Sequence, residues 1–213
     1  MHLIHRGIVN KKYKENLLKS FNQSFKKGYG IETDIHATKD GEFICFHDFT
    51  LKKTFKKNLS VKNLKYSKIS DISKNFNKPI PLLKDLLKSS KNKYPLFIEI
   101  KPVFSKSLLK SLVNETLKFT KCVFISFKHE NIFNLLKIKK NIKVGLSFSK
   151  STSIKKIIKK SNYKNINFLI LEKYFLKSKE VQNLKNEKYY YTIKTKSEFN
   201  KYKRNNNLIF ENL

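Results

Sequence analysis

The segment IEIKP, residues 98–102, carries a carboxylate and an ammonium two positions apart inside an apolar strand pattern. Successive side chains of a β-strand point to opposite faces, so Glu99 and Lys101 share one face and the two isoleucines share the other. One isolated pair of exposed charges contributes little and would be unremarkable. The pair becomes informative if other predicted strands carry charges on one face in the same way.

Strand-like and helix-like patterns alternate outward from this segment along nearly the whole chain. Short apolar runs are typical of buried strands, and apolar residues three and four positions apart are typical of amphipathic helices. Strands are predicted at residues 1–5, 30–36, 95–101, 122–127, 142–147, 166–171, 189–193 and 208–211. Helices are predicted between them at residues 15–28, 81–90, 105–119, 130–140, 151–161, 177–188 and 196–203.

This order predicts a (β/α)₈ TIM barrel formed by one domain, residues 1–213. The alternative is an open doubly wound sheet, but no G-x-G-x-x-G turn supports a nucleotide crevice. Two departures from a regular barrel are expected: a hairpin turning at Asp40 and Gly41, and an irregular, lysine-rich excursion over residues 50–79. The chain ends directly after the eighth predicted strand, so the expected barrel lacks its final helix.

The net charge of +31 is typical of proteins that bind nucleic acid or an anionic membrane surface. Only Arg6 and Arg204 among the 47 basic residues are arginines, whereas phosphate and base recognition favours the guanidinium group. The lysines are spread along the whole chain, which favours a general substitution bias over a nucleic-acid groove. We therefore expect no specific nucleic-acid partner, while the charge would help attract an anionic substrate or support transient contact with an anionic membrane surface.

Two cysteines, Cys45 and Cys122, lie in strand-like apolar runs, which predicts buried, reduced thiols. No stretch reaches the roughly 18 apolar residues of a membrane span. The opening HLIHRG is itself a predicted strand, which leaves no room for a signal peptide. The expected localisation is the cytoplasm.

Charged residues gather at the carboxyl ends of the predicted strands, where the active site of such a barrel lies. Glu32, Asp34 and Glu99 form an oxygen-rich set that suits a hard cation such as Mg²⁺ or Ca²⁺. Arg6 and Lys101 are cations that could hold phosphate oxygens. A buried charge is costly unless it is paired, so these charges predict a bound cation and a bound anion.

His5 and His47 supply groups that take and give protons near neutral pH. Either histidine alone would more often be structural, and Asp48 alone is expected to be a turn or orienting residue. Together with the carboxylates and the cations, the two histidines predict metal-assisted cleavage of a phosphate ester. His36 is expected either behind the site residues, as a support, or at the rim of the site.

Four segments carry a resemblance to a known family. HRG at 5–7, IETDIHATKDGEFICFHD at 31–48, IPLLKDLL at 80–87 and IEIK at 98–101 resemble, in order and spacing, the signature blocks of the glycerophosphodiester phosphodiesterase family. HDFTLKKT at 47–54 is similar to the family's H-D-x-x-L-x-R-T block, with Lys53 in place of arginine. The ordered set covers about the first half of the chain and is specific.

The second half resembles the family less closely. Ser126 and Phe127 are similar to an S-F pair, and YYTIK at 190–194 stands where the family has W-T-V-N, with Tyr191 for Trp and Lys194 for Asn. The closing T-D-x-P block is replaced by FENL, so Phe210 and Glu211 stand for Thr and Asp. These departures concern the substrate-binding end of the pocket and leave the metal and proton-transfer residues intact.

The resemblance implies that Glu32, Asp34 and Glu99 hold the divalent cation, while Arg6 and Lys101 bind the phosphate of a glycerophosphodiester substrate. His5 and His47 would act as acid and base, in an order left open, to give an alcohol and glycerol 3-phosphate. At the rim, Phe127 and Tyr191 would contact the substrate.

Two other functional interpretations of the sequence stay open. The first is a lysophospholipase D-type activity on membrane lysolipids, and the second is a catalytically decayed barrel that only binds phosphodiesters. A homodimer could cover the flank left by the missing helix.

Overall fold

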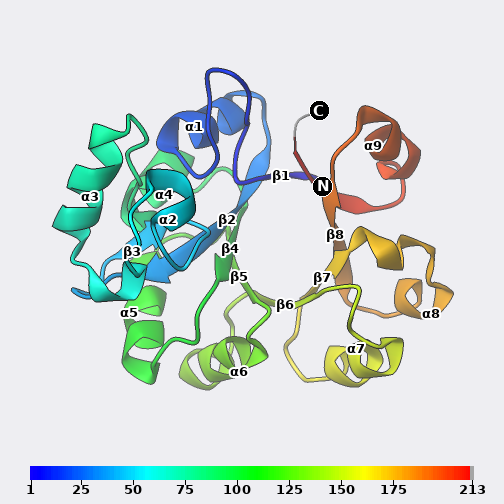
Figure 1. Ribbon diagram of the computed structural model, residues 1–213. Coiled ribbons are helices and arrows are strands. Elements are labelled where there is room, and N and C mark those ends of the chain that lie inside the picture. The colour runs from blue at the N-terminus through cyan, green and yellow to red at the C-terminus, as the bar shows by residue number, and fades with distance from the viewer. Residues whose placement is uncertain (212–213) are drawn as a thin grey trace.

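The strands form one closed barrel in the computed structural model, which describes residues 1–211 (Figure 1). Within that range the strands are β1 Leu3–His5, β2 Gly30–Ala37, β3 Phe43–Cys45, β4 Leu96–Ile100, β5 Cys122–Ser126, β6 Val144–Phe148, β7 Phe168–Glu172, β8 Glu187–Ile193 and β9 Asn207–Phe210. Their order is β1-β9-β8-β7-β6-β5-β4-β2-β3, and β1 also pairs with β2, which closes the ring. Because β3 pairs antiparallel with β2 alone, the other strands make the parallel eight-stranded barrel that the sequence predicts.

Helices surround the barrel on its outside (Figure 1). They are α1 Leu18–Lys26, α2 Lys52–Phe55, α3 Tyr66–Asn75, α4 Leu83–Ser90, α5 Lys106–Thr116, α6 His129–Ile138, α7 Ile154–Ser161, α8 Lys179–Gln182 and α9 Lys196–Tyr202, with 3₁₀ turns η1 Val61–Asn63 and η2 Lys173–Lys177. Serine side chains cap three of the described helices, because Ser105 accepts from Leu108 N, Ser153 from Lys156 N and Ser178 from Val181 N. None of the helices among the described residues has the length and apolar character to cross a membrane.

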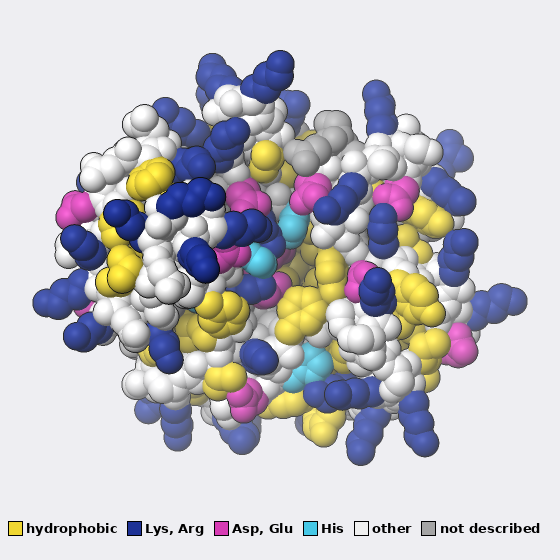
Figure 2. Space-filling model, viewed as in Figure 1, with side chains coloured by type: hydrophobic (Ala, Val, Ile, Leu, Met, Phe, Trp, Pro, Cys, Tyr) yellow, Lys and Arg dark blue, Asp and Glu magenta, His cyan; other side chains and the backbone are white. Residues whose placement is uncertain are grey.

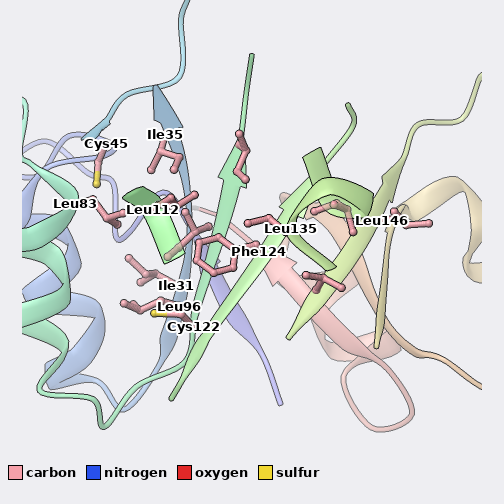
Figure 3. Close-up of a cluster of buried hydrophobic side chains, with 14 of the residues drawn as sticks. Ile31, Ile35, Cys45, Leu83, Leu96, Leu112, Cys122, Phe124, Leu135 and Leu146 are labelled. Carbon is pink, nitrogen blue, oxygen red and sulfur yellow. The ribbon is translucent and has the colours of Figure 1, made fainter. Parts of the chain in front are cut away.

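The alternation of side chains along β2 and β4 divides the barrel into two environments. Ile31 and Ile35 point outward and join Phe124 and Leu135 in the apolar layer between the sheet and the helices (Figure 3). The side chains on the opposite face of these strands point inward, and an apolar cluster around Phe97 fills the barrel interior. Glu99 lies two residues beyond Phe97 on the same face, so charged groups occupy the carboxyl end of an otherwise apolar interior.

The prediction that residues 50–79 form an irregular excursion is wrong. This range contains α2, η1 and α3, and its apolar residues form a second buried cluster with β3 and the segment before α4. Ile69 and Ile72 lie three positions apart on α3 and are buried, so the helical pattern was present among the lysines. The predicted hairpin at Asp40 and Gly41 is confirmed by the antiparallel pairing of β2 with β3.

The prediction of one helix over residues 177–188 is also wrong. The helix α8 ends at Gln182, and β8 begins at Glu187 because Glu187 and Lys188 pair with Phe168 and Leu169 of β7. Strand pairing in the tertiary structure thus overrides the local helical pattern. Up to residue 211 no helix follows β9. The last two residues of the FENL segment, 212–213, lie outside the described residues.

The two cysteines are free and buried, as the sequence predicts. Burial raises the pKa of both thiols, to about 12 for Cys122. Neither thiol is therefore a reactive thiolate near neutral pH.

Candidate active site

Three carboxylates meet at the carboxyl end of the barrel. Glu32 and Asp34 come from β2 and Glu99 from β4, and the register places Asp34 directly beside Glu99. One carboxylate oxygen from each lies within 4.8 Å of the others, and all three residues are buried. Figure 2 shows acidic and histidine side chains gathered in a hollow at the centre of this face.

Two cations hold Asp34 between them. Lys101 Nζ lies 3.3 Å from Asp34 Oδ1 and 2.7 Å from Glu99 Oε1. On the other side, Arg6 Nε lies 3.0 Å from Asp34 Oδ2, and Arg6 Nη1 lies 3.2 Å from Glu15 Oε2. Burial by itself would raise the pKa of Asp34, but the charges of Arg6 and Lys101 outweigh it and lower that pKa.

Unlike Asp34, Glu32 forms no ion pair with a lysine or arginine among the described residues. Its Oε2 atom is buried without a hydrogen-bond partner among the described residues, and His5 Nε2 lies 3.7 Å away. Burial, followed by the charges of Asp34 and Glu99, raises the pKa of Glu32 well above its ordinary value. Burial, followed by the charge of Asp34, raises the pKa of Glu99 to about 7. The three carboxylates outnumber the two cations, so this donor set fits a hard divalent cation.

The affinity for a divalent cation is expected to fall as the pH drops through about 7. The cation must displace the proton that Glu99 holds below this pH, which costs up to roughly tenfold in affinity per pH unit for each displaced proton. The stability of the cation-free protein should change with pH in the opposite direction. Because the folded-state pKa of Glu99 is raised from 4.5 to about 7, this residue increases the free energy of unfolding as the pH falls through 7 towards 4.5.

The measurement is the cation-induced rise in melting temperature at pH 8, 7 and 6. We expect the rise to be largest at pH 8. An equal rise at all three pH values would contradict this account.

Both histidines are oriented by carboxylates. His5 Nδ1 lies 2.8 Å from Glu211 Oε2, and His47 Nδ1 lies 2.7 Å from Asp48 Oδ1. An ionised carboxylate only accepts hydrogen bonds, so each Nδ1 carries the proton and donates it. In the neutral imidazole the lone pair is then on Nε2.

Two of the residues that depart from the pattern of the resembled family, Lys194 after β8 and Glu211 after β9, contact each other. Lys194 Nζ lies 3.1 Å from Glu211 Oε1, while the other oxygen of Glu211 accepts from His5. The hydrogen bond from His5, followed by the one from Lys194, lowers the pKa of Glu211 to about 2 against the opposing effect of burial. Glu211 therefore stays ionised and can orient His5.

Several contacts around the site were missed by sequence reasoning. Asn16 is buried and lies 3.4 Å from Asp34 Oδ2 through its Nδ2, and its Oδ1 accepts from Thr33 Oγ1. His36, predicted either behind the site residues or at the rim, is buried, with Nε2 3.1 Å from the carbonyl oxygen of His47. No sequence signal marked Asn16, because its position in the loop before α1 matches no motif.

A cavity of about 200 Å³ occupies the centre of this arrangement. The predicted site residues that line it are His5, Arg6, Glu32, His47, Glu99, Lys101, Phe127 and Tyr191. Asp34 lies behind this lining and is 1% exposed. Phe127 and Tyr191 meet edge to face with centroids 6.0 Å apart, and the Tyr191 hydroxyl donates to the carbonyl oxygen of Phe148. The structure thus brings all nine predicted site residues together.

Comparison with curated proteins finds one relative named a glycerophosphodiester phosphodiesterase and one named a lysophospholipase D. A glycerophosphodiester phosphodiesterase of Caldanaerobacter subterraneus subsp. tengcongensis is 26% identical over 161 residues, which cover 68% of this chain and 65% of the relative. A human lysophospholipase D is 30% identical over 131 residues, which cover 55% of this chain and 40% of the relative. The chain therefore matches only part of the length of either relative.

Solved structures share the fold. A glycerophosphodiester phosphodiesterase of Thermotoga maritima has a TM-score of 0.80 at 21% identity, covering 98% of this chain and 92% of the other. An Oleispira antarctica phosphodiesterase, solved in complex with the product sn-glycerol-3-phosphate, has a TM-score of 0.81 at 18% identity, covering 99% and 92%. The model of the glycerophosphoryl diester phosphodiesterase family matches residues 5–208, nearly the whole sequence. The chain belongs to this family.

Proposed function

We propose that the protein hydrolyses glycerophosphodiesters to an alcohol and glycerol 3-phosphate in a reaction that depends on a divalent cation, Mg²⁺ or Ca²⁺. The observation that carries this proposal is the cavity in which a buried carboxylate triad, two cations and two carboxylate-oriented histidines converge. Family membership supports the reaction class. The product named for the Oleispira antarctica neighbour supports the same glycerol phosphate half of the substrate.

Glu32, Asp34 and Glu99 would hold the cation, because Glu32 offers an oxygen that has no other partner among the described residues. A divalent cation bound there supplies Lewis-acid stabilisation of charge on the phosphoryl oxygens. Arg6 and Lys101 are the cationic side chains that line the same cavity. Their positive charges would bind the phosphate and stabilise the charge that develops on it.

His5 and His47 would transfer the protons. One Nε2 atom removes the proton of the attacking hydroxyl, which belongs to water or to the neighbouring glycerol carbon, and a new P–O bond forms. The other histidine, protonated at Nε2, gives its proton to the alcohol oxygen as the old P–O bond breaks. If the glycerol hydroxyl attacks, a cyclic phosphate forms first and water opens it.

The test is release of glycerol 3-phosphate from glycerophosphocholine and glycerophosphoethanolamine, with Mg²⁺ or Ca²⁺ and with excess chelator. We expect turnover with a cation, loss with chelator, and recovery when the cation is restored. Binding of a diester without turnover under any of these conditions would instead support the decayed barrel that only binds phosphodiesters.

A positioning role for Glu211 gives a separate prediction. Glu211→Gln should lower kcat by about 10–100-fold with little change in KM, because the neutral amide no longer fixes and stabilises the protonated form of His5. Glu211→Asp should recover part of the rate, and Lys194→Met should have a smaller effect. An unchanged kcat in Glu211→Gln, or no recovery in Glu211→Asp, would contradict this role.

A lysophospholipase D-type activity is the second candidate. The human relative carries that name, and Phe127 at the rim of the cavity is 41% exposed, where a lipid chain could contact it. Choline release from lysophosphatidylcholine, compared with release from glycerophosphocholine, separates the two candidates. The homodimer and the transient contact with an anionic membrane surface stay predictions, which a solution mass and vesicle sedimentation would test.

A further inference from the structure

A second cavity, of about 430 Å³, adjoins the active-site cavity. Four lysines line it: Lys14, Lys53, Lys56 and Lys78, and we name it the lysine cavity. The segment before α1 supplies Lys14, the α2 region supplies Lys53 and Lys56, and the segment before α4 supplies Lys78. Its volume lies in the range of small-molecule sites, whereas the active-site cavity is smaller, at about 200 Å³.

The lysine cavity meets the active site at His47. His47 lines both cavities, whereas His5 lines only the active-site cavity. Asn16, which contacts the metal-site carboxylate Asp34, also lines the lysine cavity. A diester whose phosphate lies in the active-site cavity therefore has room for its second half on the His47 side.

The charge of the lysine cavity is unbalanced. None of its four lysines takes part in an ion pair among the described residues, although lysines are abundant over the whole surface. This cavity differs from the rest of the lysine-rich surface because both carboxylates in its lining already have partners. Glu15 is paired with Arg6 and Asp48 with His47, so neither is free to balance the lysines or to bind a cationic ligand.

The apolar part of the lysine cavity does not suit a quaternary ammonium group. Recognition of such a group uses exposed aromatic faces around the cation. The aromatic side chains here, Phe46 and Phe55, are only 7% and 1% exposed. Four unpaired ammonium groups near the ligand would also repel a cation.

We propose that the lysine cavity binds the alcohol half of the substrate and selects alcohols that carry a further anionic group, such as a phosphate ester. This inference rests on the proposed function. It places the leaving alcohol beside His47, so His47 protonates the alcohol oxygen as the P–O bond breaks, and His5 accepts the proton of the attacking hydroxyl.

The experiment compares kcat/KM for glycerophosphoinositol 4-phosphate, glycerophosphoinositol and glycerophosphocholine at low salt. The wild-type protein should prefer the phosphorylated diester to glycerophosphocholine by about tenfold or more, and the preference should weaken as salt screens the lysines. Lys14→Glu with Lys53→Glu should reduce the preference by about tenfold or more, because KM rises for the phosphorylated diester and falls for glycerophosphocholine, whose cationic group the two lysines no longer repel.

The matched control is Lys155→Glu with Lys159→Glu on α7, which makes the same change in net charge at exposed positions outside both cavities. This control separates a local effect of the lysine cavity from the general attraction of anions by a basic protein. A preference that falls equally in both double variants, or a wild-type preference for glycerophosphocholine, would overturn the inference and leave the proposed function standing. Failure to hydrolyse any of the diesters would overturn both.

Discussion

Replacing His47 by alanine is expected to lower kcat for glycerophosphoethanolamine by about 10²–10⁴-fold, because the departing alkoxide then lacks a proton donor. The loss should be much smaller for a glycerol diester of 4-nitrophenol, since 4-nitrophenolate leaves without a proton. His5→Ala should slow both substrates to a similar extent, because the attacking hydroxyl needs its base whatever group departs. The ratio of the two rates in each variant is the measurement.

The two histidine variants also control for each other. Both side chains are partly exposed, with 17% for His5 and 33% for His47, so alanine should leave the melting temperature nearly unchanged. If His5→Ala were the variant rescued by the better leaving group, the roles of the two histidines would be exchanged. Equal losses on both substrates in both variants would contradict the acid and base assignment altogether.

Glu32→Gln is expected to lower activity by at least about 10²-fold, because it removes one charge from the cation site. The same substitution is not expected to destabilise the cation-free protein. In the cation-free protein the Glu32 carboxyl is buried with one oxygen that has no hydrogen-bond partner among the described residues, so the neutral amide should keep or raise the melting temperature. Added Mg²⁺ or Ca²⁺ should then raise the melting temperature less than it does in the wild-type protein.

The matched control is Glu130→Gln, which makes the same charge change at an exposed position on α6. It should alter neither activity nor the cation-induced rise in melting temperature. A large fall in the melting temperature of cation-free Glu32→Gln would show that Glu32 stabilises the fold through contacts of its own. Retention of the full cation effect in this variant would place the cation elsewhere.

The pair formed by Lys194 and Glu211 shows how two departures from a family pattern can depend on each other. Lys194 alone would leave an ammonium group without its carboxylate partner, and Glu211 alone would keep only its contact with His5 among the described residues. Together they form an ion pair, with 3.1 Å between Nζ and Oε1, and they direct the second oxygen of Glu211 to His5. The carboxyl ends of β8 and β9 therefore differ from the family pattern while a carboxylate still contacts His5.

Errors in the sequence-based prediction occurred where local pattern and tertiary packing disagree. The helix expected over residues 177–188 ends early because β7 recruits Glu187 and Lys188 into the sheet. The range 50–79 was expected to be irregular because its lysines obscured the apolar spacing of α3. Neither region contains one of the nine predicted site residues.

The sequence by itself determined the barrel and the nine residues that gather in its central site. It did so because strand periodicity places Glu32, Asp34, Glu99 and Lys101 on the inner face wherever the strands are buried on their outer face. The tertiary structure alone decided which groups touch. Closure of the barrel pairs β9 with β1, which brings Glu211 to His5 across the length of the chain. The loop before α1 and the α2 region meet around His47 only after folding, so no local sequence signal could predict the lysine cavity.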